Sequence, residues 1–176
     1  FGDYILYFAR EKFGEYDYYW IIDDDLYLNI DIDIFISDYN SSDHDLIAMN
    51  FSKSNKEWYW RQTLELDYPN NVYAMLYCIA RFSSRAIDFL KDKRSNFSPS
   101  FRLNGNLIHP NDECFSATLL ANNGFKCANL FKNDKRFNPY FSLNDVVFYE
   151  ELSIDLFEEK IIHPLCSKQR KKEKLN

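Results

Sequence analysis

The chain has 176 residues, which is about the length of one domain and is enough to bury a sizeable core. Hydrophobic residues make up 46% of the chain and aromatic residues 18%, which excludes a disordered protein. No apolar run approaches the length of about 18 residues that a membrane-spanning helix needs. The four cysteines are dispersed without a C-x-x-C pair. Neither a zinc site nor a redox dithiol is therefore indicated, and we expect a reducing, cytoplasmic location.

The net charge of -6 is unevenly distributed along the chain. Five of the 21 basic residues, but only one of the 27 acidic residues, lie within residues 168–176. The rest of the chain is strongly acidic, which argues against nucleic acid as the main partner. We interpret residues 167–176 as a basic tail. It is either a solvated end or a weak peripheral anchor to anionic lipid headgroups at the inner face of the membrane.

The first element predicted along the chain is a helix over residues 3–13. Its apolar residues recur close to helical spacing, with Asp3 suited to the N-cap and Gly14 suited to the stop. The apolar face predicted for this helix consists of Tyr4, Ile5, Phe8, Ala9 and Phe13.

An apolar, β-prone run over residues 18–22 comes next and leads directly into Asp23, Asp24 and Asp25. A buried strand cannot continue through three charges, so the carboxylates lie at its carboxyl end, where open α/β sheets bind ligands. In an extended chain Asp23 and Asp25 point to one side and Asp24 to the other. Two such carboxylates suit Mg²⁺ or Mn²⁺ bridged to the phosphates of a nucleotide. The alternative is a solvated acidic turn, although three unneutralised charges beside apolar runs would be costly.

The middle of the chain alternates between strand and helix patterns. Spaced isoleucines in residues 26–40 predict a strand, although a short helix over residues 32–39 would also bury apolar side chains. Further strands are predicted over residues 44–51 and 72–79. Such alternation, together with helices, predicts an α/β fold with a mixed or parallel sheet covered by helices.

Two features flank the second of these strands. Trp58-Tyr59-Trp60 is an aromatic cluster after a strand, which makes Trp58 and Trp60 candidates for stacking on a sugar or base. Aromatic clusters more often belong to the core, and that is the alternative. Farther on, Ser83 predicts the cap of an amphipathic helix over residues 84–93.

A second helix start is predicted at Asp112 and Glu113. Residues 96–110 carry several breakers and predict a loop, after which helical spacing resumes and Gly124 supplies a left-handed stop. Carboxylates in a first turn complement the helix dipole, which is a purely structural role. They also face whatever the preceding loop covers. Shorter strands are predicted over residues 125–130, 146–149 and 161–165.

The strand that ends in Asp23-Asp24-Asp25, together with the later Asp112-Glu113 helix start, resembles the glycosyltransferases of the GT-A fold. The second motif is similar to the helix start of the branching N-acetylglucosaminyltransferase and xylosyltransferase-like groups. The resemblance implies a mixed, mostly parallel sheet with helices on both faces. It also implies a single GT-A-like catalytic domain over residues 1–166.

The resemblance also implies roles for individual residues. Asp23 and Asp25 match the D-x-D motif that holds Mn²⁺ or Mg²⁺ and the donor diphosphate, with Asp24 between them. Glu113, or else its neighbour Asp112, matches the base that takes the proton of the acceptor hydroxyl, which implies inversion at the anomeric carbon. His163 is similar to the late histidine that completes the metal shell in several GT-A families. The alternative for His163 is a structural role.

The implied reaction is sugar transfer from a nucleotide-diphosphate donor to a glycan or lipid-linked sugar acceptor. A GT-A domain ordinarily begins with a strand-helix-strand unit that binds the nucleotide base, and here only one helix precedes the D-x-D strand. We therefore expect that this unit has been lost or that these residues belong to a longer protein. Two other functions fit the same residues. One is a metal-dependent phosphoryl-transfer enzyme or phosphodiester hydrolase. The other is a non-catalytic remnant that binds a glycan or a partner through Trp58-Tyr59-Trp60.

Overall fold

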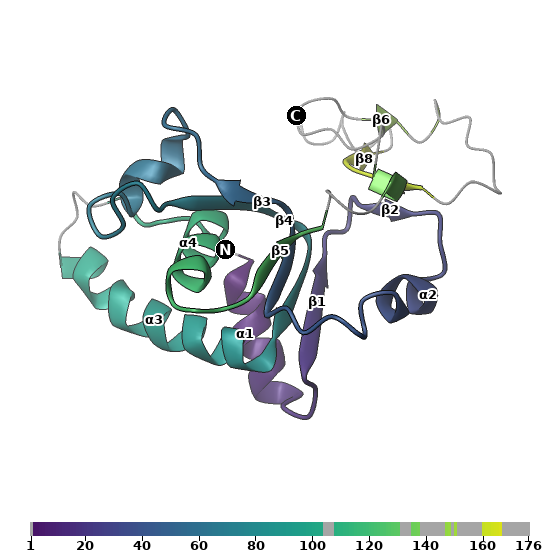
Figure 1. Cartoon of the computed structure of the whole chain (residues 1–176), viewed down its shortest axis with the longest axis horizontal. Coiled ribbons are helices and arrows are strands. Elements are labelled where there is room, and N and C mark those ends of the chain that lie inside the picture. The colour runs from purple at the N-terminus through teal and green to yellow at the C-terminus, as the bar shows by residue number, and fades with distance from the viewer. Residues whose placement is uncertain are drawn as a thin grey trace, which may run out of the picture. The chain divides into compact units, whose positions relative to one another are not determined.

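The chain forms two compact units (Figure 1). The first unit comprises Phe1–Ile21 and Asp43–Leu130, and the second comprises Ile22–Ser42 and Phe131–Asn176. The sequence predicted one domain over residues 1–166, and that boundary stays a prediction. The computed structural model describes residues 2–103, 108–130, 135–137, 147–148, 150 and 160–166.

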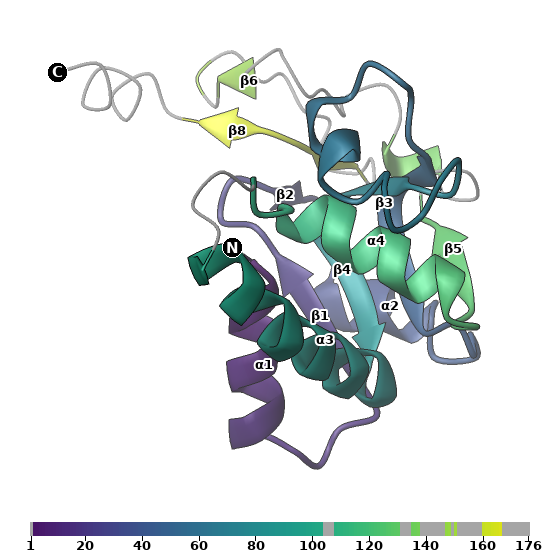
Figure 2. The same cartoon turned by 90° about the vertical axis from the view of Figure 1, so that its left-hand side faces the viewer.

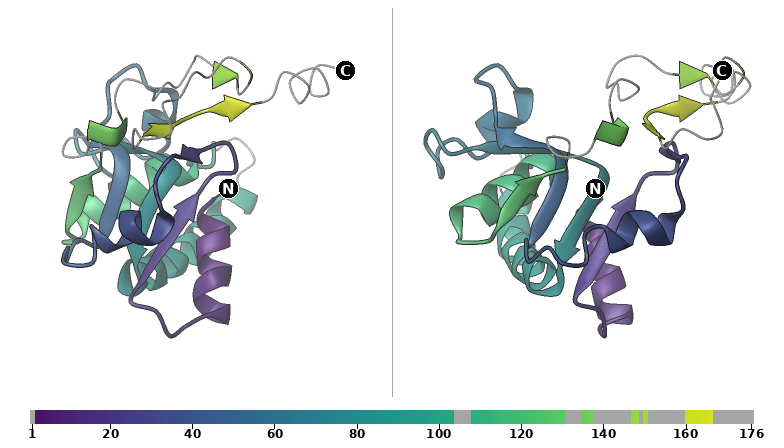
Figure 3. Two further views of the ribbon diagram at one scale, coloured as in Figure 1. Left: turned by 90° about the vertical axis from the view of Figure 1, so that its right-hand side faces the viewer. Right: turned by 45° about the vertical axis from the view of Figure 1, so that its right-hand side comes forward.

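The first unit is built on a four-stranded sheet whose order is β1-β4-β3-β5. The strands are β1 (Tyr18–Ile22), β3 (Leu46–Lys53), β4 (Tyr73–Ser83) and β5 (Cys127–Asn129). In the right panel of Figure 3 they follow one another from green β5 to purple β1. β3 pairs antiparallel with β4 and parallel with β5, so the mixed sheet is confirmed. Its longest pairing is antiparallel, which gives no support to the expectation of a mostly parallel sheet.

Three α-helices of the first unit lie in front of this sheet in Figure 2. They are α1 (Asp3–Lys12), α3 (Ser84–Leu103) and α4 (Asp112–Asn122), and a short 3-10 helix, η1 (Tyr59–Thr63), precedes β4. Because they lie on one side, the expectation of helices on both faces finds no support within this unit. Sheet and helices enclose one apolar core, which includes Leu6, Tyr7, Leu46, Phe82, Ile87, Leu90, Phe115 and Leu119.

The predicted first helix forms, but it turns a different face inward. Its buried residues are Asp3, Leu6 and Tyr7, spaced to lie on one side of a helix. Most of the predicted apolar face is exposed: Tyr4 is 46% exposed, Ile5 65%, Phe8 62% and Phe13 51%. Asp3 is also not the N-cap, a position that Gly2 occupies. Asp3 instead binds Arg94 of α3 in the interior, and that buried ion pair decides which side of α1 faces the core.

The helix α3 begins as predicted and runs farther than predicted. The amide of Ala86 donates to Ser83 Oγ at 3.2 Å, which is the expected cap. The helix then continues through Pro99 to Leu103, so the prediction of a loop from residue 96 is wrong for its first half. Packing explains the difference, because the Phe97 ring lies against the Phe115 ring of α4 with centroids 5.7 Å apart. Such tertiary contacts outweigh weak local breakers.

In the second unit, the short helix that was the alternative forms within residues 26–40, and the strand prediction is wrong for most of that stretch. The helix is α2 (Ile32–Ser37), preceded by β2 (Tyr27–Leu28). Asp31 Oδ1 accepts the amides of Asp33 at 2.8 Å and Ile34 at 3.3 Å, which caps the helix. Phe35 is fully buried. The capping Asp31 and the buried Phe35 ring thus stabilise a helix, although the alternating isoleucines favour a strand.

The remaining elements of the second unit are short. They are η2 (Lys135–Phe137), β6 (Val147–Phe148), β7 (Ile161–Ile162) and β8 (Leu165–Cys166). β2 pairs antiparallel with β7, and β6 pairs parallel with β8. Throughout the part of the chain that the structure describes, every helix is too short or too polar to cross a membrane. The predicted basic tail, residues 167–176, lies outside the described residues.

Candidate functional site

The acidic turn follows β1 as the sequence predicts. The strand ends at Ile22, and the amide of Leu26 donates to the carbonyl of Asp23 at 3.2 Å, which closes a tight turn. Asp23 and Asp24 are exposed on this turn and Asp25 is half-buried. The three carboxylates therefore follow the end of β1, although only Tyr19 of this strand is buried and the expected buried strand is instead a half-buried strand at the edge of the sheet.

His163 reaches this turn because of strand pairing. In the antiparallel β2-β7 pair, Tyr27 lies opposite Ile162 and Leu28 opposite Ile161. Continuing this register by one residue brings His163 beside the residue before Tyr27. The amide of Leu165 donates to the carbonyl of Asp25 at 2.8 Å, which extends the pairing past the strands. The backbone thus brings a late histidine to the acidic turn.

Asp23, Asp25 and His163 form a group that could hold a metal ion, called here the metal trio. His163 Nε2 lies 3.5 Å from Asp25 Oδ1, and one ligand atom from each residue falls within 4.8 Å of the others. Two carboxylate oxygens and one imidazole nitrogen suit Mn²⁺ well and Mg²⁺ less well, since Mg²⁺ prefers oxygen ligands. The residues present therefore fit the cation that the sequence predicted. Asp24 does not belong to this group.

The second predicted group lies at the start of α4, in the first unit. Asn111 is its N-cap, and Asn111 Oδ1 accepts the amide of Cys114 at 2.9 Å. Asp112 and Glu113 occupy the first turn, as predicted, and both are half-buried. Asn111 Nδ2 donates to Glu113 Oε2 at 3.2 Å. The start of α4 is therefore a compact polar cluster and not only a pair of acidic side chains.

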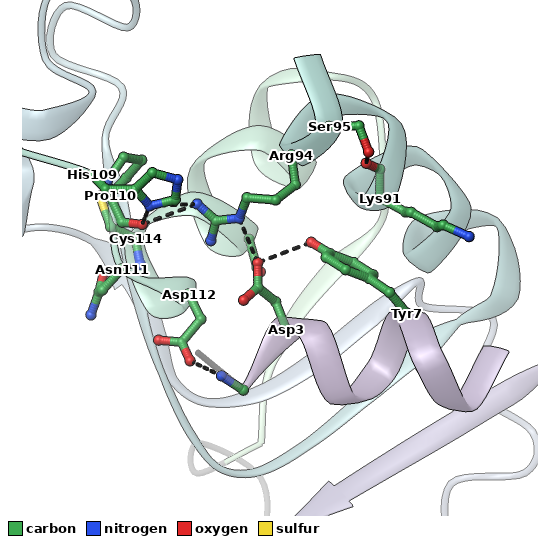
Figure 4. A network of polar contacts seen from close by, with 12 residues as sticks. Asp3, Tyr7, Lys91, Arg94, Ser95, His109, Pro110, Asn111, Asp112 and Cys114 are labelled. Atoms are coloured by element: carbon green, nitrogen blue, oxygen red, sulfur yellow. Dashed lines mark hydrogen bonds and ion pairs between the residues drawn. The ribbon is translucent and has the colours of Figure 1, made fainter. Parts of the chain in front are cut away.

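The structure separates the roles of Asp112 and Glu113. Asp112 Oδ2 accepts a hydrogen bond from the amide of Gly2, and Asp112 Oδ1 accepts the amide of Glu113 at 3.0 Å. A Cβ added to Gly2 would lie 3.1 Å from Asp112 Oδ2 and 3.1 Å from the Tyr77 ring, so the two chain segments meet closely. Figure 4 shows the Asp112 carboxylate pointing toward this amide. Asp112 is thus engaged in fastening the start of α1, which favours Glu113 as the candidate base.

The aromatic cluster lies beside the start of α4. Cys114 Sγ donates to the carbonyl of Trp60 at 3.3 Å, which joins η1 to α4. Trp58 and Trp60 are half-buried and pack against the core. A core role was the alternative to the prediction that they stack on a sugar or base. Tyr59 is 57% exposed, and its ring meets the Trp60 ring edge-on with centroids 5.0 Å apart. Within this cluster, Tyr59 is therefore the side chain most open to a ligand.

Arg61 was not singled out from the sequence, although it lies in the same stretch. Its side chain is 7% exposed, pairs with Glu65 at 2.8 Å and donates to the carbonyl of Ser54 at 3.2 Å. The pKa of the Cys114 thiol is raised to about 11, chiefly by burial, against hydrogen bonds from Thr63 and Thr118 that lower it. Of the nearby charges, the Glu113 carboxylate raises this pKa and the Arg61 guanidinium lowers it. Glu113 and Arg61 therefore both act on one buried thiol. The i,i+4 spacing of Arg61 and Glu65 was the available sequence signal.

A buried polar network, which the sequence analysis did not predict, contacts the residue just before the N-cap of α4 (Figure 4). Arg94 Nε donates to Asp3 Oδ2 at 2.6 Å, and Tyr7 donates to the same oxygen at 3.0 Å. Arg94 Nη1 donates to the carbonyl of Pro110 at 3.0 Å, immediately before α4. The Arg94 guanidinium also lies over the Phe115 ring, 3.7 Å from its centroid. The network joins α1, α3 and α4 through one arginine.

Comparisons with protein-family models, with curated proteins and with solved structures find no match to this sequence. The GT-A resemblance therefore stays a prediction based on motifs.

Proposed function

We propose that the protein is a metal-dependent glycosyltransferase that moves a sugar from a nucleotide-diphosphate donor to a hydroxyl acceptor such as a glycan. The observation that carries this proposal is the metal trio. Asp25 and His163 are far apart in the sequence, yet His163 Nε2 lies 3.5 Å from Asp25 Oδ1. A D-x-D turn joined by a late histidine is the arrangement that the GT-A resemblance implies.

The metal trio would hold the cation together with the donor diphosphate. A divalent cation bound there would neutralise the negative charge that grows on the leaving diphosphate. Glu113 would accept the proton of the acceptor hydroxyl as its oxygen bonds to the anomeric carbon. The bond from that carbon to the diphosphate oxygen breaks at the same time, and its electron pair leaves with the nucleotide. A single displacement of this kind inverts the anomeric carbon. The exposed Tyr59 would provide a stacking surface for an acceptor sugar.

A phosphodiester hydrolase is the second candidate, since carboxylates and histidine also serve two-metal chemistry. Such sites hold two ions about 3.5–4 Å apart, which requires more ligands than one trio supplies. Within the described residues, the metal trio is the single group of this kind. Transfer to a sugar acceptor is therefore the function that we favour.

The metal trio can be tested by calorimetry with Mn²⁺ and a panel of nucleoside diphosphates. The wild-type protein should bind Mn²⁺ weakly alone and at least about tenfold more tightly with the matching nucleotide, because the phosphates supply the remaining ligands. Asp25→Asn should abolish this coupling. Asp24→Asn is the matched control, since it removes a charge from the same turn but not from the trio. Unchanged coupling in Asp25→Asn would mean that the metal assignment is wrong.

The candidate base can be tested by transferase assays on Glu113→Gln. The isosteric amide cannot accept a proton, so the turnover number should fall about a hundredfold or more while donor and Mn²⁺ affinities stay unchanged. Asp112→Asn should be milder in rate, because Asp112 is engaged with Gly2. If both variants keep near-full activity, the acceptor base lies elsewhere. The reverse order of effects would identify Asp112 as the base.

A further inference from the structure

Asn111 uses both ends of its side-chain amide at the start of α4. Its oxygen accepts the amide of Cys114 at 2.9 Å, and its nitrogen donates to Glu113 Oε2 at 3.2 Å. Asn111 is 9% exposed, so the capping contact is buried, whereas the contact with the half-buried Glu113 is partly open to water. Only the first of them caps the helix. The second is directed at the side chain that is the candidate base.

Capping alone does not require asparagine. Serine and aspartate cap helices about as well, because capping needs only a side-chain oxygen that accepts an amide. Neither serine nor an ionised aspartate offers the planar N–H donor with which Asn111 reaches Glu113. Any of these residues would therefore satisfy the first contact, whereas the second contact uses the side-chain nitrogen that asparagine adds.

We propose that Asn111 is a positioning residue for Glu113, which it holds by one carboxylate oxygen in the ionised form that a general base needs. This inference rests on the proposed function, since it assigns Asn111 a part in the same proton transfer. A donor to a carboxylate favours its charged form, and a fixed donor also limits its rotation. Asn111 does not exchange a proton itself.

The surroundings hold Asn111 in place. The carbonyl of Pro110, the residue before it, accepts Arg94 Nη1 at 3.0 Å, and Arg94 is itself anchored by Asp3. The carbonyl of Asn111 accepts the amide of Phe115 at 3.0 Å as the first turn of the helix. In Figure 4 the Asn111 side chain lies apart from the contact that engages Asp112. The backbone that carries the Asn111 side chain is therefore held by α3 at Pro110 and by α4 at Asn111 itself.

The charged or titratable groups near Glu113 include Asp112, Cys114 and Arg61. Asp112 lies in the same turn, Cys114 follows directly, and Arg61 of η1 acts on the Cys114 thiol together with Glu113. Cys114 stays neutral because burial raises its pKa to about 11. Asp112 is a like charge, so a donor at Asn111 offsets part of that repulsion.

Two substitutions separate capping from positioning. Asn111→Ser and Asn111→Asp both keep a capping oxygen, so both variants should unfold at nearly the wild-type temperature. Both lose the amide N–H donor that reaches Glu113, because the serine hydroxyl is shorter and aspartate has no donor, and aspartate also adds a like charge. The acid limb of the rate profile should therefore move to higher pH, by about half a unit or more for serine and about one unit or more for aspartate. The turnover number on the plateau should also fall about tenfold, with little change in the donor KM.

Asn70→Asp is the matched control. It makes the same change from amide to carboxylate at an exposed loop residue with a φ of 61°, a conformation that aspartate tolerates. This variant should keep the wild-type pH profile. The ionisation of Glu113 can also be followed directly by carbon-detected NMR. Its carboxyl signal is identified as the one that is present in the wild-type spectrum and absent from the spectrum of Glu113→Gln.

The outcomes distinguish this inference from the proposed function. Unchanged rate profiles and an unchanged Glu113 titration in both Asn111 variants would overturn the positioning role while transferase activity stands. A wild-type protein that transfers no sugar would overturn the proposed function. That result would also overturn the catalytic role of Asn111, even if the pH at which Glu113 titrates still changed in the Asn111 variants. A shifted acid limb together with a shifted Glu113 titration is the result that we expect.

Discussion

The acidic residues of this chain differ in role according to their hydrogen-bond donors and their burial. Asp45 is 3% exposed and accepts Arg85 Nε at 2.6 Å, Ser83 Oγ at 2.8 Å and the Lys126 amide at 2.9 Å. Burial alone would raise the pKa of Asp45, but these donors outweigh it and lower the pKa below its usual value. Asp45 thus joins the segments that lead into β3, α3 and β5, and its role is structural.

Stability that depends on Asp45 should be sensitive to acid. Because the folded protein holds the pKa of Asp45 low, its contribution is present above the unfolded pKa of about 4 and is lost as the pH falls through the folded pKa. In urea unfolding at pH 7, Asp45→Asn should lower the free energy of unfolding by about 2 kcal/mol. The difference from wild type should shrink toward pH 2.

The neighbouring Asp43 provides the control for that measurement. It pairs with Lys126, and both side chains are well exposed. Asp43→Asn should therefore unfold at nearly the wild-type urea concentration, because exposed pairs contribute little. An Asp45→Asn difference that did not depend on pH would contradict the explanation through ionisation.

At the scale of secondary-structure elements, α1 shows how one buried ion pair can overrule an apolar pattern. Asp3 and Arg94 have side chains 0% and 2% exposed, and their contact joins α1 to α3. Lys91 of α3 also pairs with Glu11 at 2.6 Å, and Arg10 pairs with Asp88 at 3.0 Å, along the same side of α1. The face with the ion pairs therefore turns toward α3, while Ile5 and Phe8 stay exposed.

A double-mutant cycle would test this explanation of how α1 docks. Asp3→Ala leaves the Arg94 charge buried without its carboxylate, so it should lower the free energy of unfolding by about 3–5 kcal/mol. Arg94→Met should be similar in size. The double variant should lose clearly less than the sum of the two, because neither charge is then left alone. Additive losses in urea unfolding would mean that the two side chains act independently.

At the scale of the whole molecule, the residues with predicted functional roles are distributed over both units. The metal trio belongs to the second unit, whereas Glu113 and the aromatic cluster belong to the first. Contact with a membrane is predicted only for the basic tail, residues 167–176.

Deleting residues 167–176 should affect location but not folding. Five cations are each worth about 1 kcal/mol near an anionic surface, which can recruit a protein but does not hold a fold together. The melting temperature should stay nearly unchanged, while binding to vesicles that contain anionic lipid should fall at low salt. A second variant, in which the tail cations are changed to glutamine, keeps the length of the chain and removes only the charge. Undiminished vesicle binding by both proteins would contradict a role for the tail in lipid binding.

The sequence alone determined the features that depend on neighbouring residues. The strand β1 and its acidic end, the helix start at Asp112 and Glu113, and the left-handed stop at Gly124, whose φ is 78°, all appear where they were predicted. Each follows from local physics: consecutive charges end an apolar, β-prone run, a polar residue caps a helix, and glycine adopts a positive φ at little cost. These features needed no knowledge of distant contacts.

Only the tertiary structure decided which distant residues meet. The pairing of β2 with β7 brings His163 to Asp25, and the contact of Gly2 with Asp112 separates the roles of two adjacent carboxylates. The inward face of α1 was likewise settled by Arg94, ninety-one residues beyond Asp3. Periodicity records which side chains share a face of a helix or strand but not which partner that face will meet. A buried charge constrains that choice, because leaving it without its partner costs about 3–5 kcal/mol, which no apolar pattern along α1 records.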